Sequence, residues 1–179
     1  PCTGGSATSA MFTLKNISQS TPYPGCSNTI KVEITSNIPL RYQDKAVIEI
    51  FLDRNLAIGL SPGDVVLGGA HSDRFFGTRE RTNETARGRW APEMDPPRFL
   101  LNVAKDKDSN PCTTYSVTFT VINPMTDNVR PNQPSTPGLL QAAQNVEISA
   151  RGADGVLIYP SGMVVDETES MSLPHTTKA

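Results

Sequence analysis

The run Tyr115–Val121 reads YSVTFTV, and large apolar residues alternate with Ser and Thr through its whole length. Successive side chains of a β-strand point to opposite faces, so this pattern predicts a strand with one face in a hydrophobic core. The run Thr29–Thr35 reads TIKVEIT and alternates in the same way, with Lys and Glu on the polar side. These two half-buried strands indicate a sheet that is covered on one face and wet on the other.

Further strand signals surround these two runs. We expect strands at Met11–Lys15, Ala46–Leu52, Val65–Leu67, Phe99–Val103, Val146–Ala150 and Val156–Tyr159, with Met163–Val165 as a last edge strand. The residues GADG at 152–155 predict a hairpin connection. Helix signals are limited to one turn at Arg54–Leu60 and a short helix at Gly138–Gln144, because many prolines interrupt longer candidates.

The predicted fold is all-β: an antiparallel two-sheet sandwich (Ig-like) of about eight strands with two long loops. An unbroken barrel is the alternative. The long loops run from about Gly68 to Pro97 and from about Asn123 to Gln144. Loops of this length usually make functional contacts.

Length and composition fit one globular domain. The chain has 179 residues, of which 37% are hydrophobic and 19% charged, and its net charge of -2 gives no general reason to bind nucleic acid or anionic lipid. No apolar run approaches the roughly 18 residues that a membrane helix needs. We expect a sandwich domain at 1–165, followed at 166–179 by a polar tail or a linker to a following module. Because the sequence starts at Pro1 without an initiator Met, we expect it to be either a processed product or a segment of a longer protein.

Three cysteines, Cys2, Cys26 and Cys112, occur without a C-x-x-C pair, which disfavours a zinc knuckle or a redox motif. Cys26 and Cys112 each precede a strong strand, and two strands that start at the same end of a sandwich could bring them together. We therefore expect a Cys26–Cys112 disulfide formed in an oxidising compartment. Three free thiols, or a bond that involves Cys2, are the alternatives.

Two sequons support a secreted protein. They are Asn16-Ile17-Ser18 and Asn83-Glu84-Thr85, so Asn16 and Asn83 are candidate glycosylation sites.

No motif predicts an enzyme. His71 and His175 are the two histidines of the sequence, and the patterns G-x-S-x-G, G-x-G-x-x-G and H-E-x-x-H do not occur. His71 is better explained as a loop residue bonded to backbone than as a catalytic base. Scattered carboxylates, Glu49 and Asp64 among them, show no spacing that defines an acid pair. We expect no catalytic residues and no cofactor.

The segment Asp106–Asn110 has the D-x-D-x-N start of a calcium loop. Pro111 stands where such a loop needs Gly, and Val117 stands where it needs the closing Glu. We therefore interpret this segment as a solvated turn, and we expect no bound metal.

The segment 74–90 combines arginines with aromatic residues, which is the composition of interface hot spots. The residues that we expect to contact a partner are Phe75, Phe76, Arg79, Arg81 and Arg87. In the alternatives, the segment is a solvated loop whose Phe76 and Trp90 fill the core, or it binds an acidic glycan.

Four stretches carry a family resemblance: Ile17–Ile34, Asn37–Leu40, Tyr115–Pro124 and Val146–Ala150. Their order is an S-T-P-Y-P-G turn, an N-T-I strand, an N-x-P-L turn, a T-F-x-V-x-N-P strand and an I-S-A strand. This order resembles a β-rich repeat module found many times over in very large secreted or surface proteins of algae and other protists. The resemblance implies an extracellular structural role, and that pattern contains no catalytic motif. The loop around His71 and Arg87 is longer and more charged than in the pattern.

The sequence thus favours a structural module of a protist filament, cell-surface coat or wall. Its expected partners are other copies or neighbouring modules of the same assembly, with glycans as a further possibility, and we expect no nucleic acid and no membrane insertion. An adhesin or carbohydrate-binding module is the alternative function.

Overall fold

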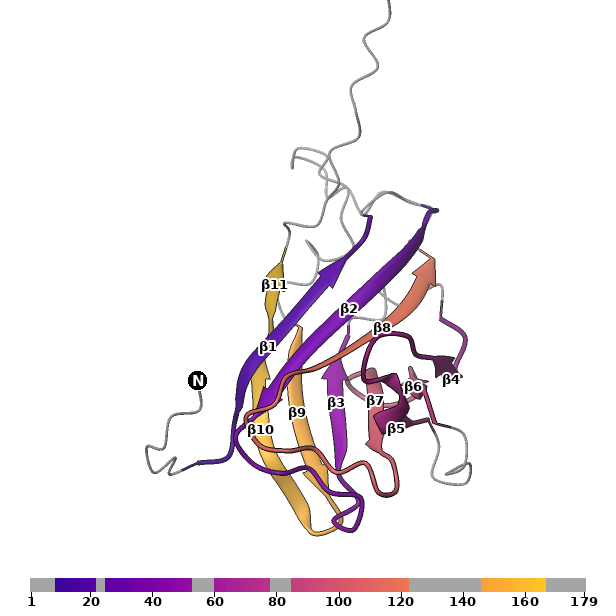
Figure 1. Ribbon diagram of the computed structural model, residues 1–179. Helices are drawn as coiled ribbons and strands as arrows, with labels where there is room; N and C mark the ends of the chain where they lie inside the picture. The colour runs from indigo at the N-terminus through magenta and orange to yellow at the C-terminus, as the bar shows by residue number, and fades with distance from the viewer. Residues whose placement is uncertain (1–8, 22–24, 53–59, 78–84, 123–145, 167–179) are drawn as a thin grey trace, which may run out of the picture.

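The computed structural model describes residues 9–21, 25–52, 60–77, 85–122 and 146–166 (Figure 1). Apart from one 3-10 turn, η2 (Ser72–Arg74), the regular structure in these ranges is β. The strands are β1 (Phe12–Gln19), β2 (Ser27–Ser36), β3 (Val47–Phe51), β4 (Gly63–Val66), β5 (Phe75–Phe76), β6 (Arg87–Ala91), β7 (Arg98–Val103), β8 (Tyr115–Ile122), β9 (Glu147–Gly152), β10 (Gly155–Gly162) and β11 (Val164–Asp166).

These strands form two packed sheets, so the predicted sandwich is confirmed. Within the described residues, one sheet has four strands in the order β11-β1-β2-β8. The other has seven, in the order β10-β9-β3-β7-β6-β4, with β5 paired to β7. Every described pair is antiparallel except β1 with β11, which are parallel.

The core lies between the inner faces of the two sheets. The four-stranded sheet contributes the alternate residues predicted from the sequence, such as Val32 and Val117, which are 0% and 2% exposed. The seven-stranded sheet contributes Phe99, whose ring stacks on Phe119 of the opposite sheet with centroids 4.3 Å apart. This stack joins the two layers through β7 and β8.

Both sides of the sandwich are linked across. On one side the chain passes from β10 at the edge of the larger sheet directly into β11 at the edge of the smaller sheet. On the other side Gly68 and Thr118 of β8 exchange two backbone hydrogen bonds, of 2.8 and 2.9 Å. A Cβ on Gly68 would lie 2.8 Å from the Thr118 hydroxyl oxygen, so this close approach requires glycine.

Two asparagines hold the ends of β1. The Asn28 side chain is fully buried; its amide donates to Gln19 Oε1 at 3.0 Å, and its Oδ1 accepts the backbone N–H groups of Ser20 and Thr21. At the other end, Asn37 Oδ1 accepts the Met11 N–H at 2.8 Å. Both asparagines belong to the motifs that carry the family resemblance, and here their role is to satisfy backbone groups where β1 begins and ends.

The nine predicted strands all occur, with ends shifted by a few residues, and the hairpin between β9 and β10 is confirmed. Two strands were not predicted, because β5 and β6 lie in the segment 68–97 that we expected to be one long loop. The second predicted loop, 123–144, and the predicted helix at 138–144 lie outside the described residues, as does the helical turn at 54–60 except for Leu60.

Candidate interaction surface

The aromatic residues of the predicted interface are not on the surface. Phe75 and Phe76 are 4% and 3% exposed, and Trp90 is 2% exposed. Phe75 and Trp90 pack in the main core, while Phe76 meets the ring of Tyr42 edge-on at 6.4 Å. Pairing of β5 and β6 with β7 turns these rings inward, so the prediction that Phe75 and Phe76 contact a partner is wrong. The alternative, aromatic residues that fill the core, is the one observed.

The predicted interface also included three arginines, and the structure describes one of them. Arg79 and Arg81 lie outside the described residues, as does Asn83. Arg87 is half-buried in β6 and pairs with Val66 of the edge strand β4. Of the five predicted contact residues, Arg87 is therefore the one that the structure places beside an exposed edge.

Arg74 and Lys107 lock two loops together at one end of the sandwich. The Arg74 guanidinium lies 4.9 Å from the centre of the Tyr115 ring and donates to the carbonyl oxygens of Lys107 and Asp108. Lys107 Nζ lies 2.7 Å from Asp73 Oδ2, and this hydrogen bond lowers the pKa of the Asp73 carboxyl. The arginine that precedes the two phenylalanines therefore serves the fold of this loop pair.

His71 belongs to the same cluster. Its Nδ1 accepts the Ser116 N–H at 3.1 Å, and its ring meets Tyr115 edge-on at 5.3 Å. This is the backbone-bonded loop histidine that the sequence favoured over a catalytic base.

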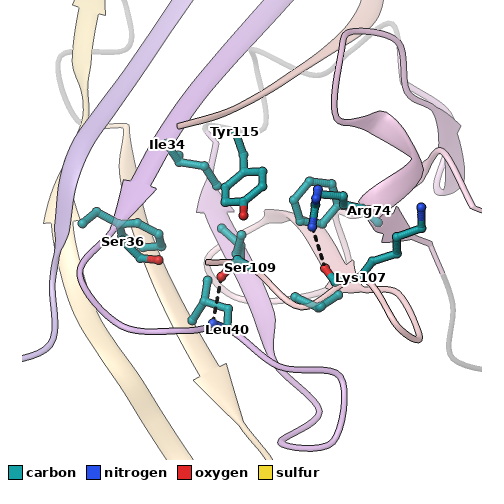
Figure 2. A pocket seen from close by; sticks show the side chains of 11 residues that line it. Ile34, Ser36, Leu40, Arg74, Lys107, Ser109 and Tyr115 are labelled. Carbon is teal, nitrogen blue, oxygen red and sulfur yellow. Dashed lines mark hydrogen bonds between the residues drawn. The ribbon is translucent and has the colours of Figure 1, made fainter. Parts of the chain in front are cut away.

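A small cavity lies beneath these loops, and Figure 2 shows the side chains that line it. Ile34, Leu40 and Tyr115 form part of its wall, and Arg74 and Lys107 lie on one side of it. Its free volume is about 10 Å³, which is room for about one water molecule. Pockets that bury a drug-sized ligand are larger by more than an order of magnitude.

The segment predicted as a turn with a partial calcium motif is bound to the rest of the protein. Asp108 Oδ1 accepts the Tyr42 N–H at 2.8 Å, and Ser109 Oγ accepts the Leu40 N–H at 2.8 Å. Asp108, a carboxylate that a calcium loop would use, thus holds the connection between β2 and β3 together with the neighbouring Ser109. Among the described residues, no group of three or more His, Cys, Asp or Glu side chains is placed to hold a metal ion.

The predicted Cys26–Cys112 disulfide is not formed. Cys26 is an exposed free thiol next to Ser27, which pairs with Ile122 at one end of the β2–β8 ladder. Cys112 lies at the other end, where its N–H donates to Ser36 O at 2.7 Å. Ten residues of β2 separate these ends by about 30 Å, far more than the roughly 7 Å between Cα atoms that a disulfide tolerates.

The error in that prediction has a simple cause. The two strands that the cysteines precede are antiparallel neighbours, so their starting points lie at opposite ends. Cys112 is disulfide-bonded. The third cysteine of the sequence, Cys2, lies outside the described residues.

Asn16, the candidate glycosylation site within the described residues, lies in the middle of β1. It pairs with Glu33 on one side and Val164 on the other, and its side chain is half-buried. The next residue, Ile17, is 1% exposed and faces the core, so Asn16 lies on the outer face of the four-stranded sheet. A glycan attached there would cover that face.

The larger sheet carries an ionic cluster around a buried glutamate on its outer face. Glu49 of β3 is 6% exposed and receives Arg151 Nε at 2.7 Å and Arg98 Nη1 at 3.2 Å, both on Oε1. Ser149 donates to its second oxygen at 3.4 Å. The carboxylate therefore bonds to side chains from both neighbouring strands, β7 and β9. This arrangement fixes the three strands relative to one another and leaves no open position on Oε1 for a substrate.

The sheet edges are the part of the surface with the chemistry of a contact site. Six large apolar residues are exposed in the described chain: Met11, Val66, Ile122, Val156, Tyr159 and Val164. Five of them lie on the edge strands β4, β8, β10 and β11, and each of these four strands carries at least one. Tyr159 is 76% exposed, the highest value among them. Sequence reasoning missed this set, although apolar residues at the polar positions of an alternating strand, such as Ile122 after Val121, are the signal that could have found it.

No protein-family model matches this chain, and no curated protein matches it. Within the described residues, there is no helix of sufficient length and hydropathy to cross a membrane.

Proposed function

We propose that this protein is an extracellular structural module of a protist filament, cell-surface coat or wall, and that it acts through module–module contacts. The observation that carries the proposal is the distribution of exposed apolar residues along the edge strands of both sheets. Unpaired edge strands are templates for association, and soluble proteins usually protect them with charge. Of the four edge strands, β8 is bonded to Gly68 and His71 at Thr118 and Ser116, and its Ile122 lies beyond these bonds. Here the edge strands present valine, isoleucine and tyrosine to solvent.

Three further observations support a structural role in an oxidising compartment. Cys112 is disulfide-bonded, as expected outside the cytosol. The sequon at Asn16 faces outward from the four-stranded sheet. The cavity beneath the Arg74 loop has room for about one water molecule, which fits a packed core.

Association through the edges can be tested with charge. Lysine substitutions at Val66, Ile122, Tyr159 and Val164 should each weaken self-association of the chain, measured by sedimentation over a concentration series. Met11→Lys is the matched control, because Met11 is 46% exposed but precedes β1 and lies on no edge strand. Equal effects at Met11 and at the edges would remove the edge argument.

Negative-stain images of the native material test the proposal itself. Repeating polymers or layers are expected. A strict monomer that binds sugars would instead establish the alternative, an adhesin or carbohydrate-binding module. In that alternative Trp90 cannot stack on a sugar, because its side chain is buried, so a glycan signal should depend on Arg87.

A further inference from the structure

The first and last described strands lie side by side and run in the same direction. Asn16 pairs with Val164, Ile17 with Val165 and Ser18 with Asp166, which makes this the parallel pair among the described strands. Figure 1 shows β1 rising from one end of the sandwich and β11 pointing towards the other end. The chain therefore joins the described fold at Phe12 and leaves it at Asp166, about 20 Å further along the strand direction.

This arrangement decides how tension would act. A pull on the chain before β1 and after β11 draws the two strands past each other along their own axes. All hydrogen bonds between them then carry load together, and they must break together. In an antiparallel hairpin pulled at its open end, the bonds carry load one at a time and break in sequence. The first geometry resists a given force for much longer.

β1 is held to the rest of the fold by more contacts than β11 is. It pairs with β2 from Phe12 to Gln19, and Asn37 and Asn28 fasten the backbone at its two ends. β11 is held over three register positions, with Val165 packed against the core. The β1–β11 contact is therefore the part of the force path that has to yield first.

Cys112, the disulfide-bonded residue, lies at the end of the four-stranded sheet where β1 begins. Cys112 N–H bonds to Ser36 O, and Ser36 pairs with Phe12 at the start of β1. A force that reached the fold through Cys112 would hold the four-stranded sheet from that end and would still shear β11 against β1.

We propose that the β1–β11 pair is a mechanical clamp that resists extension of the chain along the strand direction. The clamp would respond to a pulling force that neighbouring modules transmit to the chain, so the inference rests on the proposed structural function. Forced unfolding is governed by the unfolding rate and not by the equilibrium free energy, so a short parallel pair in the right place suffices.

Single-molecule force spectroscopy on the whole chain tests the clamp. Handles attached before Pro1 and after Ala179 load β1 against β11. A second attachment at Asp154, in the turn between β9 and β10, replaces the handle after Ala179. Figure 1 shows this turn at the same end of the sandwich as the start of β1, so the pull then acts across the strands. The end-to-end geometry should give the higher unfolding force, with and without reductant.

Two double substitutions separate the clamp from general stability. Val164→Pro with Val165→Pro removes both valine N–H groups of β11, and at least one of these faces β1 because successive N–H groups alternate in direction. Val65→Pro with Val66→Pro makes the same change in β4, another short edge strand, which lies off the force path. Both pairs combine one valine packed against the core with one valine about 60% exposed: Val164 is 59% and Val66 is 64% exposed.

Only the β11 variant should lower the unfolding force, with the unfolding rate at fixed force rising by about fivefold for each loaded bond lost. Chemical denaturation should show similar destabilisation of both variants. Equal loss of force in the two variants, or an unchanged force in the β11 variant, would overturn the clamp. A high force in a chain whose native material forms no assembly would keep the clamp and remove the proposed function, and a low force in a chain that does assemble would do the reverse.

Discussion

The two sheets of the sandwich differ in how they use their outer faces. On the four-stranded sheet, Lys31 and Glu33 form an ion pair of 3.3 Å, and both side chains are about one-third exposed. On the seven-stranded sheet, Glu49 is 6% exposed between two arginines, and Val47 and Leu100 form a second small hydrophobic cluster beside it. One sheet has a dry face and a wet face, whereas the middle of the other is covered on both faces.

This difference explains which strands the sequence identifies most clearly. A strand between core and solvent must alternate, and β2 and β8 do so. A strand covered on both faces has no polar side to display, so β3 reads as VIEIF with a single charge. That charge, Glu49, occupies the outer face, where arginines of β7 and β9 neutralise it.

The largest effect is expected where the two sheets meet. Phe99→Ala should lower the free energy of unfolding by about 3–5 kcal/mol, because Phe99 is fully buried and its ring stacks on Phe119. Urea denaturation of Phe99→Ala, Phe119→Ala and the double variant measures this and the coupling across the sandwich. Strictly additive losses would show that the two layers do not depend on this stack.

Two Glu→Gln substitutions, one on the outer face of each sheet, test this comparison directly. Glu49→Gln leaves two arginines beside a neutral amide and should cost about 2–3 kcal/mol of unfolding free energy. Glu33→Gln is the matched control on the wet face and should cost less than about 0.5 kcal/mol. Similar losses for the two variants would mean that the outer face of the larger sheet is no less solvated than that of the smaller one.

The inner face of the larger sheet is tested at Gly88. A Cβ at this position would collide with the Phe99 ring, so Gly88→Ala should destabilise the protein by about 1–2 kcal/mol. Gly162→Ala in β10 is the control, because a Cβ there meets no atom within 4 Å. Thermal unfolding followed by circular dichroism compares the two, and a neutral Gly88→Ala would indicate a loosely packed β6–β7 contact.

Gly88 also shows why part of the fold escaped prediction. β6 reads RGRWA, in which the inward positions are Gly88 and Trp90 and the outward ones are arginines. The alternation is present, but its first inward residue is glycine, because the Phe99 ring from the neighbouring strand fills the space. The sequence shows that position 88 has no side chain, but it does not show that the Phe99 ring fills the space.

The candidate site was harder to predict for a related reason. The arginines and aromatic residues near Phe75 have the composition of an interface, yet pairing with β7 turns the rings inward. The order of strands in a sheet depends on contacts far apart in the sequence, and so does the identity of the edges. Val66, Tyr159 and Val164 become surface residues of interest only once β4, β10 and β11 are known to be edges.

The smallest effect is expected at a solvent-exposed ion pair, the one between Lys107 and Asp73, whose side chains are 43% and 53% exposed. The hydrogen bond from Lys107 lowers the pKa of Asp73 below its ordinary value of 3.8. The unfolded chain therefore binds a proton at this carboxyl at a higher pH than the folded chain does. The resulting stabilisation is present above about pH 4 and is lost as the pH falls through the folded pKa.

Lys107→Met should remove this contribution, which solvent screening keeps well below 1 kcal/mol. The measurement is the free energy of unfolding in urea at several values between pH 6 and pH 2.5, together with the NMR titration of the Asp73 carboxyl. Lys105→Met removes a neighbouring lysine and should leave the Asp73 titration unchanged. If Lys107→Met leaves both the titration and the low-pH slope as they are in the unmodified protein, this ion pair does not hold the loops at the end of the sandwich, and the contacts of Arg74 and His71 must do so.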